Sequence, residues 1–433
     1  MAIQKSIYES LVVESNDQKK SVDIAQGAVS LDYYEDIFSP TITATLRIIN
    51  TGTTVDNQSI YNGLPLRGGE RLILKVAPNS QNVKTSLDFT TPERYLYVSS
   101  ISDVIAETNR ESFTLNLVSR EAITNETIRV TKKYASSSRI DESVRGILNE
   151  YLLANKIKQI DKTSNPYGFV GNLRKPFTVL IWLASKSVPE GNNANAGFVF
   201  YQTKEGFNFR SLDGLIQQES KATYTYSQGS ESYDGNSKID NDFKILNYFV
   251  DKNQNMLEKL RLGAFSSQRM FFNPLNFTVT SPQDGEFTSE DYKDVKTLGG
   301  KQKIPKVSDG SGKTFGDIPS RIFTQILDIG TIEKDVSKDL NSDPAKYQAQ
   351  SLVRYNLLMT QTLSIIVPCN LDLNAGNVIE CNFPKVNSSE DAKEYDTEVS
   401  GLYIIKELCH HFDVENSYTS MKLIRDTFGK QKK

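Results

Sequence analysis

The residue types best suited to chemistry gather in one short stretch of this chain. Both of its histidines, His410 and His411, directly follow Cys409. Residues 401–412 have the composition of a β-strand, and adjacent strand residues point to opposite faces, so the two histidines cannot ligate one metal ion. Cys409 and His411 share a face but stand about 6.6 Å apart along the strand. Two ligands also do not complete a zinc site, which needs three or four.

The strand pattern therefore predicts structural roles for these side chains. We interpret His410 as a hydrogen-bonded histidine at the edge of a barrel, because buried polar groups are nearly always paired. On a regular strand it shares its face with Leu402, Ile404 and Leu408. A nucleophilic pair of Cys409 and His410 would need both side chains on one side, which such a strand forbids. Cys369 and Cys381 could add thiolates from neighbouring strands, but inert buried thiols are the usual case.

Other candidate catalytic groups are weak. No Gly-x-Ser-x-Gly elbow is present. The neighbouring carboxylates Glu35–Asp36 and Glu390–Asp391 could suggest a glycosidase, which places two acids across a cleft. With 53 acidic residues in the chain, such neighbours arise by chance, and both pairs have turn-like surroundings. We predict no catalytic, cofactor-binding or metal-ligating residues, no cofactor, and no enzyme activity.

The composition of the chain limits the classes of partner that it can bind. The formal charge of -3 includes no basic excess, so we expect no specific nucleic-acid binding. The N-terminus lacks the apolar core of a secretion signal. Apolar stretches such as residues 363–367 are far too short to span a bilayer, and we expect no membrane insertion. Three cysteines are an odd, sparse set that indicates a reducing compartment.

The elements that position these residues begin with strands. Residues 41–48, 72–76 and 113–117 alternate apolar with polar side chains, which is typical of half-buried strands. Several antiparallel strands with short turns predict a small barrel or sandwich. The high content of tyrosine and phenylalanine agrees, because flat aromatic side chains pack well on sheets.

The pattern becomes mixed near residue 126. Apolar residues at 140, 144, 147, 148, 151 and 152 follow one face of a helix. Pro176 predicts the start of a second helix, since proline is tolerated at the first helical position. Residues 197–209 predict a β-hairpin around Lys204, Glu205 and Gly206. Residues 281–319 are polar and rich in Gly, Ser, Lys and Asp, and we predict a long exposed loop that a partner covers.

A further helix is predicted to begin at Asp343–Pro344. Strands return at residues 362–367, 377–382, 401–408 and 418–424. The whole order of elements predicts an α+β chain with a first β-barrel at residues 1–125 and a second β-barrel at 346–433. Between them lies a middle α/β region, 126–345, which contains the loop 281–319 and could donate strands to the second barrel. The two ends could be copies of one barrel, although no residue-level repeat is visible.

Several segments together resemble the central baseplate hub proteins of contractile-tailed phages, which are related to the hub part of VgrG-type spike proteins. Residues 117–152 (LVSREAITNETIRVTKKYASSSRIDESVRGILNEYL) resemble the family's passage from strand to amphipathic helix. Residues 175–188 and 197–216 resemble its next helix and the hairpin that follows. Residues 406–424 (KELCHHFDVENSYTSMKLI) resemble its final hairpin, with His410 at the family's histidine. The shared order of these degenerate segments is the specific signal.

This resemblance implies two similar antiparallel β-barrels with α/β lobes between them. It also implies a homotrimer that forms a pseudo-sixfold ring, lines the DNA passage, and joins the sixfold tail tube to the threefold central spike. The implied partners are tail tube or tube-initiator proteins and a separate central spike protein, with tape measure and baseplate wedge proteins as further candidates. The implied location is the virion tail baseplate, after synthesis in the host cytoplasm. A tail-associated cell-wall hydrolase and a carbohydrate-binding β protein are the alternatives.

Overall fold

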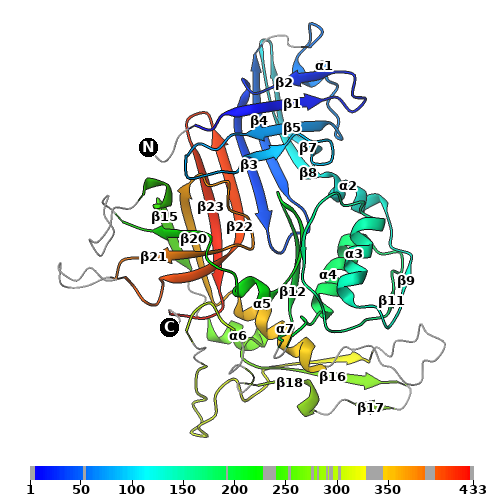
Figure 1. Cartoon of the computed structure of the whole chain (residues 1–433), viewed down its shortest axis with the longest axis vertical. Helices are drawn as coiled ribbons and strands as arrows, with labels where there is room; N and C mark the ends of the chain where they lie inside the picture. The colour runs from blue at the N-terminus through cyan, green and yellow to red at the C-terminus, as the bar shows by residue number, and fades with distance from the viewer. Residues whose placement is uncertain are drawn as a thin grey trace.

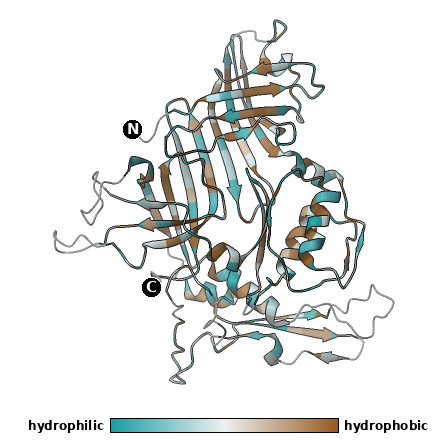
Figure 2. Ribbon diagram, viewed as in Figure 1, coloured by the Kyte–Doolittle hydropathy of each residue, from teal (hydrophilic) through white to brown (hydrophobic). Residues whose placement is uncertain are grey.

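One sheet of 14 strands, built from both ends of the chain, dominates the molecule (Figure 1). The computed structural model describes residues 5–51, 55–191, 194–227, 240–251, 255–274, 277–279, 282–288, 291, 296–300, 304–327, 345–385 and 395–429. The chain is mostly β-structure with few helices. Hydrophobic and hydrophilic residues alternate along the long strands (Figure 2), so each strand gives one face to a core.

The N-terminal unit contributes strands in the order β3-β4-β8-β7-β5-β1-β2, all paired antiparallel. Their bounds are β1 Tyr8–Glu14, β2 Ser21–Asp23, β3 Ala28–Asp36, β4 Thr43–Thr51, β5 Arg71–Val76, β7 Leu96–Glu107 and β8 Arg110–Ser119. The short β6, Leu87–Phe89, pairs with β5, and α1 is Ile60–Gly63. Alternate residues such as Leu46 and Leu115 are buried in one core, as their period-2 pattern predicts.

The C-terminal unit has the order β15-β20-β23-β22-β21-β14. Its strands are β20 Gln361–Pro368, β21 Val378–Asn382, β22 Gly401–Asp413 and β23 Ser417–Arg425, which confirms the four strands predicted from the sequence. The middle of the chain adds β14, Thr223–Thr225, and β15, Asn247–Asp251, at the two ends of this order. The strands surround a second core that includes Leu363, Tyr403 and Leu423.

The two units join through the pairing of β22 with β3, residues Glu407–Asp413 against Ser30–Asp36. The predicted pair of separate closed barrels is therefore wrong: among the described strands, neither unit closes on itself. The edge of β3 that could have closed the first barrel is taken by β22 instead. Among the described residues of the second unit, the closest approach to closure is an isolated bridge between Thr225, at the end of β14, and Lys244, three residues before β15.

The two units share one strand order despite their different sequences. In the N-terminal unit β3, β4, β5, β7 and β8 lie in the order β3-β4-β8-β7-β5, and in the C-terminal unit β15, β20, β21, β22 and β23 lie in the order β15-β20-β23-β22-β21. Each pairing is antiparallel in both units. In the final hairpin of each unit the register shifts opposite the residue that lies two before the end of the last strand, between Val98 and Ser100 and between Ile405 and Glu407. Strand β7 has a second shift, between Ser102 and Ile105, that β22 lacks. The chain therefore contains a structural repeat that its sequence does not show.

An α/β lobe lies between the units. It holds α2 Arg120–Thr127, α3 Ile140–Glu150, α4 Pro176–Lys186 and α5 Leu212–Ile216, with β9 Lys133–Tyr134, β10 Ile157–Ile160, β11 Phe169–Val170, β12 Phe198–Thr203 and β13 Gly206–Ser211. The predicted helices at residue 140 and at Pro176 and the predicted hairpin are confirmed. Helices α3 and α4 pack their apolar faces against the aromatic residues of the hairpin, such as Phe200 and Phe207.

A small sheet lies at the far end of the molecule from the N-terminal unit (Figure 1). It comprises β16 Ser267–Asn273, β17 Thr278–Val279, β18 Glu286–Phe287 and β19 Arg321–Ile326, with α6 Met256–Leu262, α7 Ala345–Leu357, η1 Asn241–Phe243 and η2 Pro282–Gly285 nearby in the sequence. Part of the predicted exposed loop 281–319 is in fact anchored. Phe287 is buried against α7 and Leu298 is buried beside the C-terminal unit, because these apolar residues interrupt the polar stretch. Asp343 and Pro344, the predicted start of α7, lie outside the described residues.

Candidate functional site

The two histidines point to opposite sides of β22, as the strand pattern predicts. His410 is fully buried, its Nδ1 lies 2.9 Å from the hydroxyl of Thr419, and its ring stacks on Tyr33. Burial, with the nearby charge of Lys204, holds the pKa of His410 well below its usual value. It shares the core with Leu408 rather than with Leu402 and Ile404. The bulge at Lys406 shifts the alternation by one residue, which the sequence prediction missed.

His411 lies on the other face, where Nδ1 is 2.5 Å from Oδ1 of Asp32 on β3. The Cys409 thiol lies 3.7 Å from the same carboxylate oxygen. Burial, and then the charge of Asp32, raise the pKa of Cys409 to about 12, so the thiol is protonated at neutral pH. Burial also raises the pKa of Cys369 to about 12 and that of Cys381. Within the described part of the chain, no cluster of three His, Cys, Asp or Glu side chains could hold a metal ion.

Glu35 is sealed inside the junction of three parts of the chain. Its carboxylate accepts hydrogen bonds from the backbone N–H of Lys204 at 2.7 Å, the N–H of Ala375 at 2.8 Å and the hydroxyl of Tyr33 at 2.8 Å. Burial raises the pKa of Glu35, while burial lowers the pKa of the buried Lys204 ammonium, which donates to the carbonyl of Leu373. This carboxylate ties the hairpin β12–β13 to both units.

The side chains of Glu35 and Asp36 point to opposite sides of β3. Glu35 is buried, whereas Asp36 lies on the opposite side of β3 and accepts from the backbone N–H of Phe38 at 2.8 Å. Residues 390 and 391, the other carboxylate pair, lie outside the described residues. The described pair therefore lacks the arrangement of two acids across a substrate cleft that glycoside hydrolysis needs.

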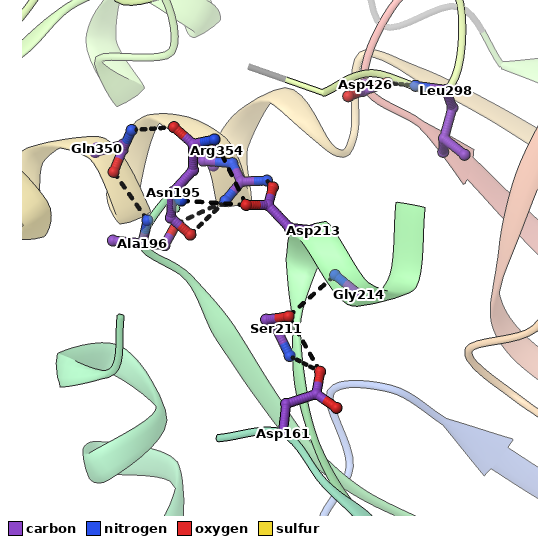
Figure 3. Close-up of polar contacts among 10 residues, drawn as sticks. All are labelled: Asp161, Asn195, Ala196, Ser211, Asp213, Gly214, Leu298, Gln350, Arg354 and Asp426. Atoms are coloured by element: carbon purple, nitrogen blue, oxygen red, sulfur yellow. Dashed lines mark hydrogen bonds and ion pairs between the residues drawn. The ribbon is translucent and has the colours of Figure 1, made fainter. Parts of the chain in front are cut away.

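A second buried network, drawn in Figure 3, attaches α7 to the hairpin. The Arg354 guanidinium donates to Asp213 at 2.5 Å and to the carbonyl oxygens of Asn195 and Ala196 at 2.9 and 3.0 Å. One turn earlier, Gln350 donates to the side chain of Asn195 and accepts from the N–H of Ala196. Both terminal nitrogens of this guanidinium have acceptors and one of these is a carboxylate, so the burial of its charge is compensated.

Both buried networks were missed by sequence reasoning. The signal that could have found Arg354 is its place on α7, four residues after Gln350 and beside the apolar Val353 and Leu357, where a solvated arginine is not expected. No sequence signal indicated that Lys204 is buried, because a lysine in a tight turn is normally exposed.

The surface that spans both units is a polar face of the long sheet. It consists of residues paired across neighbouring strands: Asp32, Tyr34, Thr43, Thr45, Asn116, Ser364, Glu407, Cys409, His411, Tyr418, Ser420 and Lys422. A hollow lies over the joint of the two units and is lined by several of these residues. On this face Lys422 lies 3.1 Å from Glu407, and His411 contacts Asp32. Arg47, which pairs across the strands with Ser30 and Thr114, is an exposed cation of the same face. The polar face can border water.

Comparison with known proteins gave no matching family model and no matching curated sequence. Solved structures do match. The 43 kDa tail protein of prophage MuSo2 from Shewanella oneidensis has a TM-score of 0.54 at 7% identity, over 96% of this chain and 98% of that one. The tail protein from Neisseria meningitidis has a TM-score of 0.51 at 10% identity, over 96% of each chain. This chain has a phage tail-protein fold.

A third match is to a chain of the Francisella PdpA–VgrG complex, with a TM-score of 0.45 and 12% identity, over 100% of this chain and 53% of that one. The tail-protein fold here extends over nearly the whole length of the two tail proteins, so both units and the lobe between them belong to it. Among its described helices, none is long and apolar enough to cross a membrane.

Proposed function

We propose that this chain is a structural baseplate hub of a contractile phage tail. In this proposal three chains form a ring that joins the sixfold tail tube to the threefold central spike. The structural repeat carries the proposal. Two units with the same strand order in each chain give six similar units in a homotrimer, which is what a partner with sixfold symmetry requires. The tail-protein fold supports it.

The polar face is the surface that we assign to the DNA passage. It lies on the side of the strands away from both cores, and it continues from one unit to the other across the β22–β3 joint. Lys422 is paired with Glu407 and Arg47 is an exposed cation of this face, whereas tight binding to phosphate would need many Lys and Arg contacts. DNA can then move past the polar face without being held there.

The remaining parts follow the same proposal. The units that correspond to the predicted regions 1–125 and 346–433 contact the tail tube or tube-initiator proteins, and the opposite side of the ring receives the central spike protein. Tape measure and baseplate wedge proteins are further candidate partners of the middle region, 126–345. The location is the virion tail baseplate, after synthesis in the host cytoplasm.

The test is electron microscopy of the purified chain, alone and mixed with its tube and spike proteins. We expect rings with threefold symmetry whose outline is close to hexagonal, positioned between tube and spike. Particles that attach to neither protein and show no ring would contradict the hub function.

A further inference from the structure

The joint between the two units within one chain is a template for the joint between chains. Strand β22 divides one edge between two neighbours. Its first residues pair with β21, and residues Glu407–Asp413 pair with β3, the first strand of the other unit. If six units form a ring, each unit must meet the next in a similar way.

The structural repeat identifies the strands that would make the second kind of joint. By strand order, β7 corresponds to β22, and β15 corresponds to β3. On the edge away from β8, β7 pairs with β5 at Leu96 and Tyr97, and Val98 makes two more backbone hydrogen bonds, to Gly69 and Glu70 just before β5. Beyond that, residues 99–107 have no strand partner on this edge within the described structure. Strand β15 likewise ends the sheet, with β20 as its one described neighbour.

Both open edges carry exposed apolar side chains. Phe249 on β15 is 68% exposed, and Ile105 on β7 is 58% exposed, with Val104 beside it. Edge strands with apolar side chains are templates for pairing with another chain unless something covers them. Each copy of the chain thus has one edge that can donate a strand and one that can accept it.

The register of the two units decides which residues would meet. One row of directly paired residues in the N-terminal unit runs Asp32, Thr45, Asn116, Ser100. The matching row in the C-terminal unit, placed by the shared bulge, runs Phe249, Ser364, Lys422, Glu407. Phe249 therefore occupies the position of Asp32.

Counted along β8 and β23, the same alignment places Ile105 at the position of His411; β7 itself has a second bulge, between Ser102 and Ile105, that takes up one extra residue and that β22 lacks. Four residues before Asn116, Ser112 pairs with Ile105, and four residues before Lys422, Tyr418 pairs with His411. Within the chain, Asp32 is the direct partner of His411. The equivalent partners across a chain boundary are Phe249 and Ile105, and each is exposed in the single chain.

We propose that β15 of one copy of this chain adds antiparallel to the open edge of β7 in the next copy, with Phe249 packed against Ile105. This inference rests on the proposed hub function and names its subunit interface. The contact is heterologous, since a donor edge meets a different acceptor edge, and repeated contacts of this kind close into a ring. Backbone hydrogen bonds supply much of the affinity in strand addition, and the apolar pair fixes the register.

Disulfide formation tests the register directly, because side chains on directly opposite strand residues lie close enough to be linked. The variant carries Phe249→Cys and Ile105→Cys in a Cys409→Ser background, and is oxidised with copper–phenanthroline at a few concentrations. The matched control pairs Phe249→Cys with Ile322→Cys, because Ile322 is 56% exposed but lies on β19 in the small sheet. Each single-cysteine variant is oxidised in parallel.

We expect covalent dimers and closed trimers on non-reducing gels from the 249–105 pair, at least tenfold above the control pair and the single variants. A trimer detected by light scattering that gives no 249–105 link would overturn the strand addition while leaving the hub function in place. Equal linking in the control would also overturn it. A chain that stays monomeric and unlinked overturns the strand addition, and the hub function fails with it only if no rings form with the tube and spike proteins.

Discussion

Replacing Phe249 with aspartate should weaken the association of the chain with itself. A phenylalanine side chain buries about 200 Å² when fully covered. The 68% that Phe249 exposes in the single chain therefore offers about 140 Å², which is worth about 3.5 kcal/mol at 25 cal/mol per Å². Ordering the side chain costs about 1 kcal/mol. The remaining stabilisation of about 2.5 kcal/mol per boundary corresponds to a roughly 70-fold change in affinity.

The assay is sedimentation velocity over a range of protein concentrations, which gives the association constant of each variant. Phe277→Asp is the matched control, because Phe277 is 79% exposed but lies just before β17 in the small sheet. It should leave association unchanged. The double variant Phe249→Asp with Ile105→His should recover part of the loss, since it copies the Asp32–His411 pair into the boundary. Equal association of Phe249→Asp and Phe277→Asp would refute the assignment.

Four further outcomes are expected within the chain. Arg354→Ala should lower the free energy of unfolding in urea by about 3–5 kcal/mol, because it leaves the buried Asp213 carboxylate without its ion-pair partner. The double variant Arg354→Ala, Asp213→Ala should lose less than the sum of the two single changes. The pKa of His410 is lowered in the folded chain, so below about pH 6.5 the unfolded chain binds a proton that the folded chain does not. The free energy of unfolding should therefore fall with decreasing pH by up to about 1.4 kcal/mol per pH unit, and His410→Leu should flatten that slope. Gly206→Ala should destabilise the hairpin by about 1–3 kcal/mol in the same unfolding assay, because φ is +125° and the new Cβ would lie 2.6 Å from a backbone carbonyl oxygen. Purified chain should not clear a suspension of cell walls; clearing that was abolished by Glu407→Gln, whose carboxylate lines the hollow on the polar face, would instead favour the hydrolase alternative.

Local elements were predictable from the sequence because their signals are local. The apolar spacing from residue 140 and the proline at 176 indicate α3 and α4, and the turn at Gly206 between aromatic strands indicates the hairpin. The strand that carries the histidines was also predicted, although its phase was not. Residues 402–405 are apolar on both faces, so no polar residue marks where the alternation slips.

Long-range pairing could not be predicted in the same way. The partner of β22 is β3, nearly 400 residues earlier, and nothing near either strand encodes that choice. The two units are similar in strand order but not in residues, so the repeat becomes visible only through register. The burial of Glu35 and Lys204 could not be predicted for a similar reason. Charged residue types indicate exposure, and only the hydrogen-bond partners that the fold brings to these two side chains explain why they are buried.

The division of β22 between β21 and β3 also governs the mechanics of the chain. A hinge between the units would have to break the pairing of seven consecutive residues, and Glu35 further fastens the hairpin across the same place. In the proposed ring, the curvature over one-third of the circumference would then be set during folding, before any subunit meets another. Under the proposed function, adjustment between a sixfold and a threefold neighbour would be left to the boundaries between chains, which would be the compliant points of the assembly.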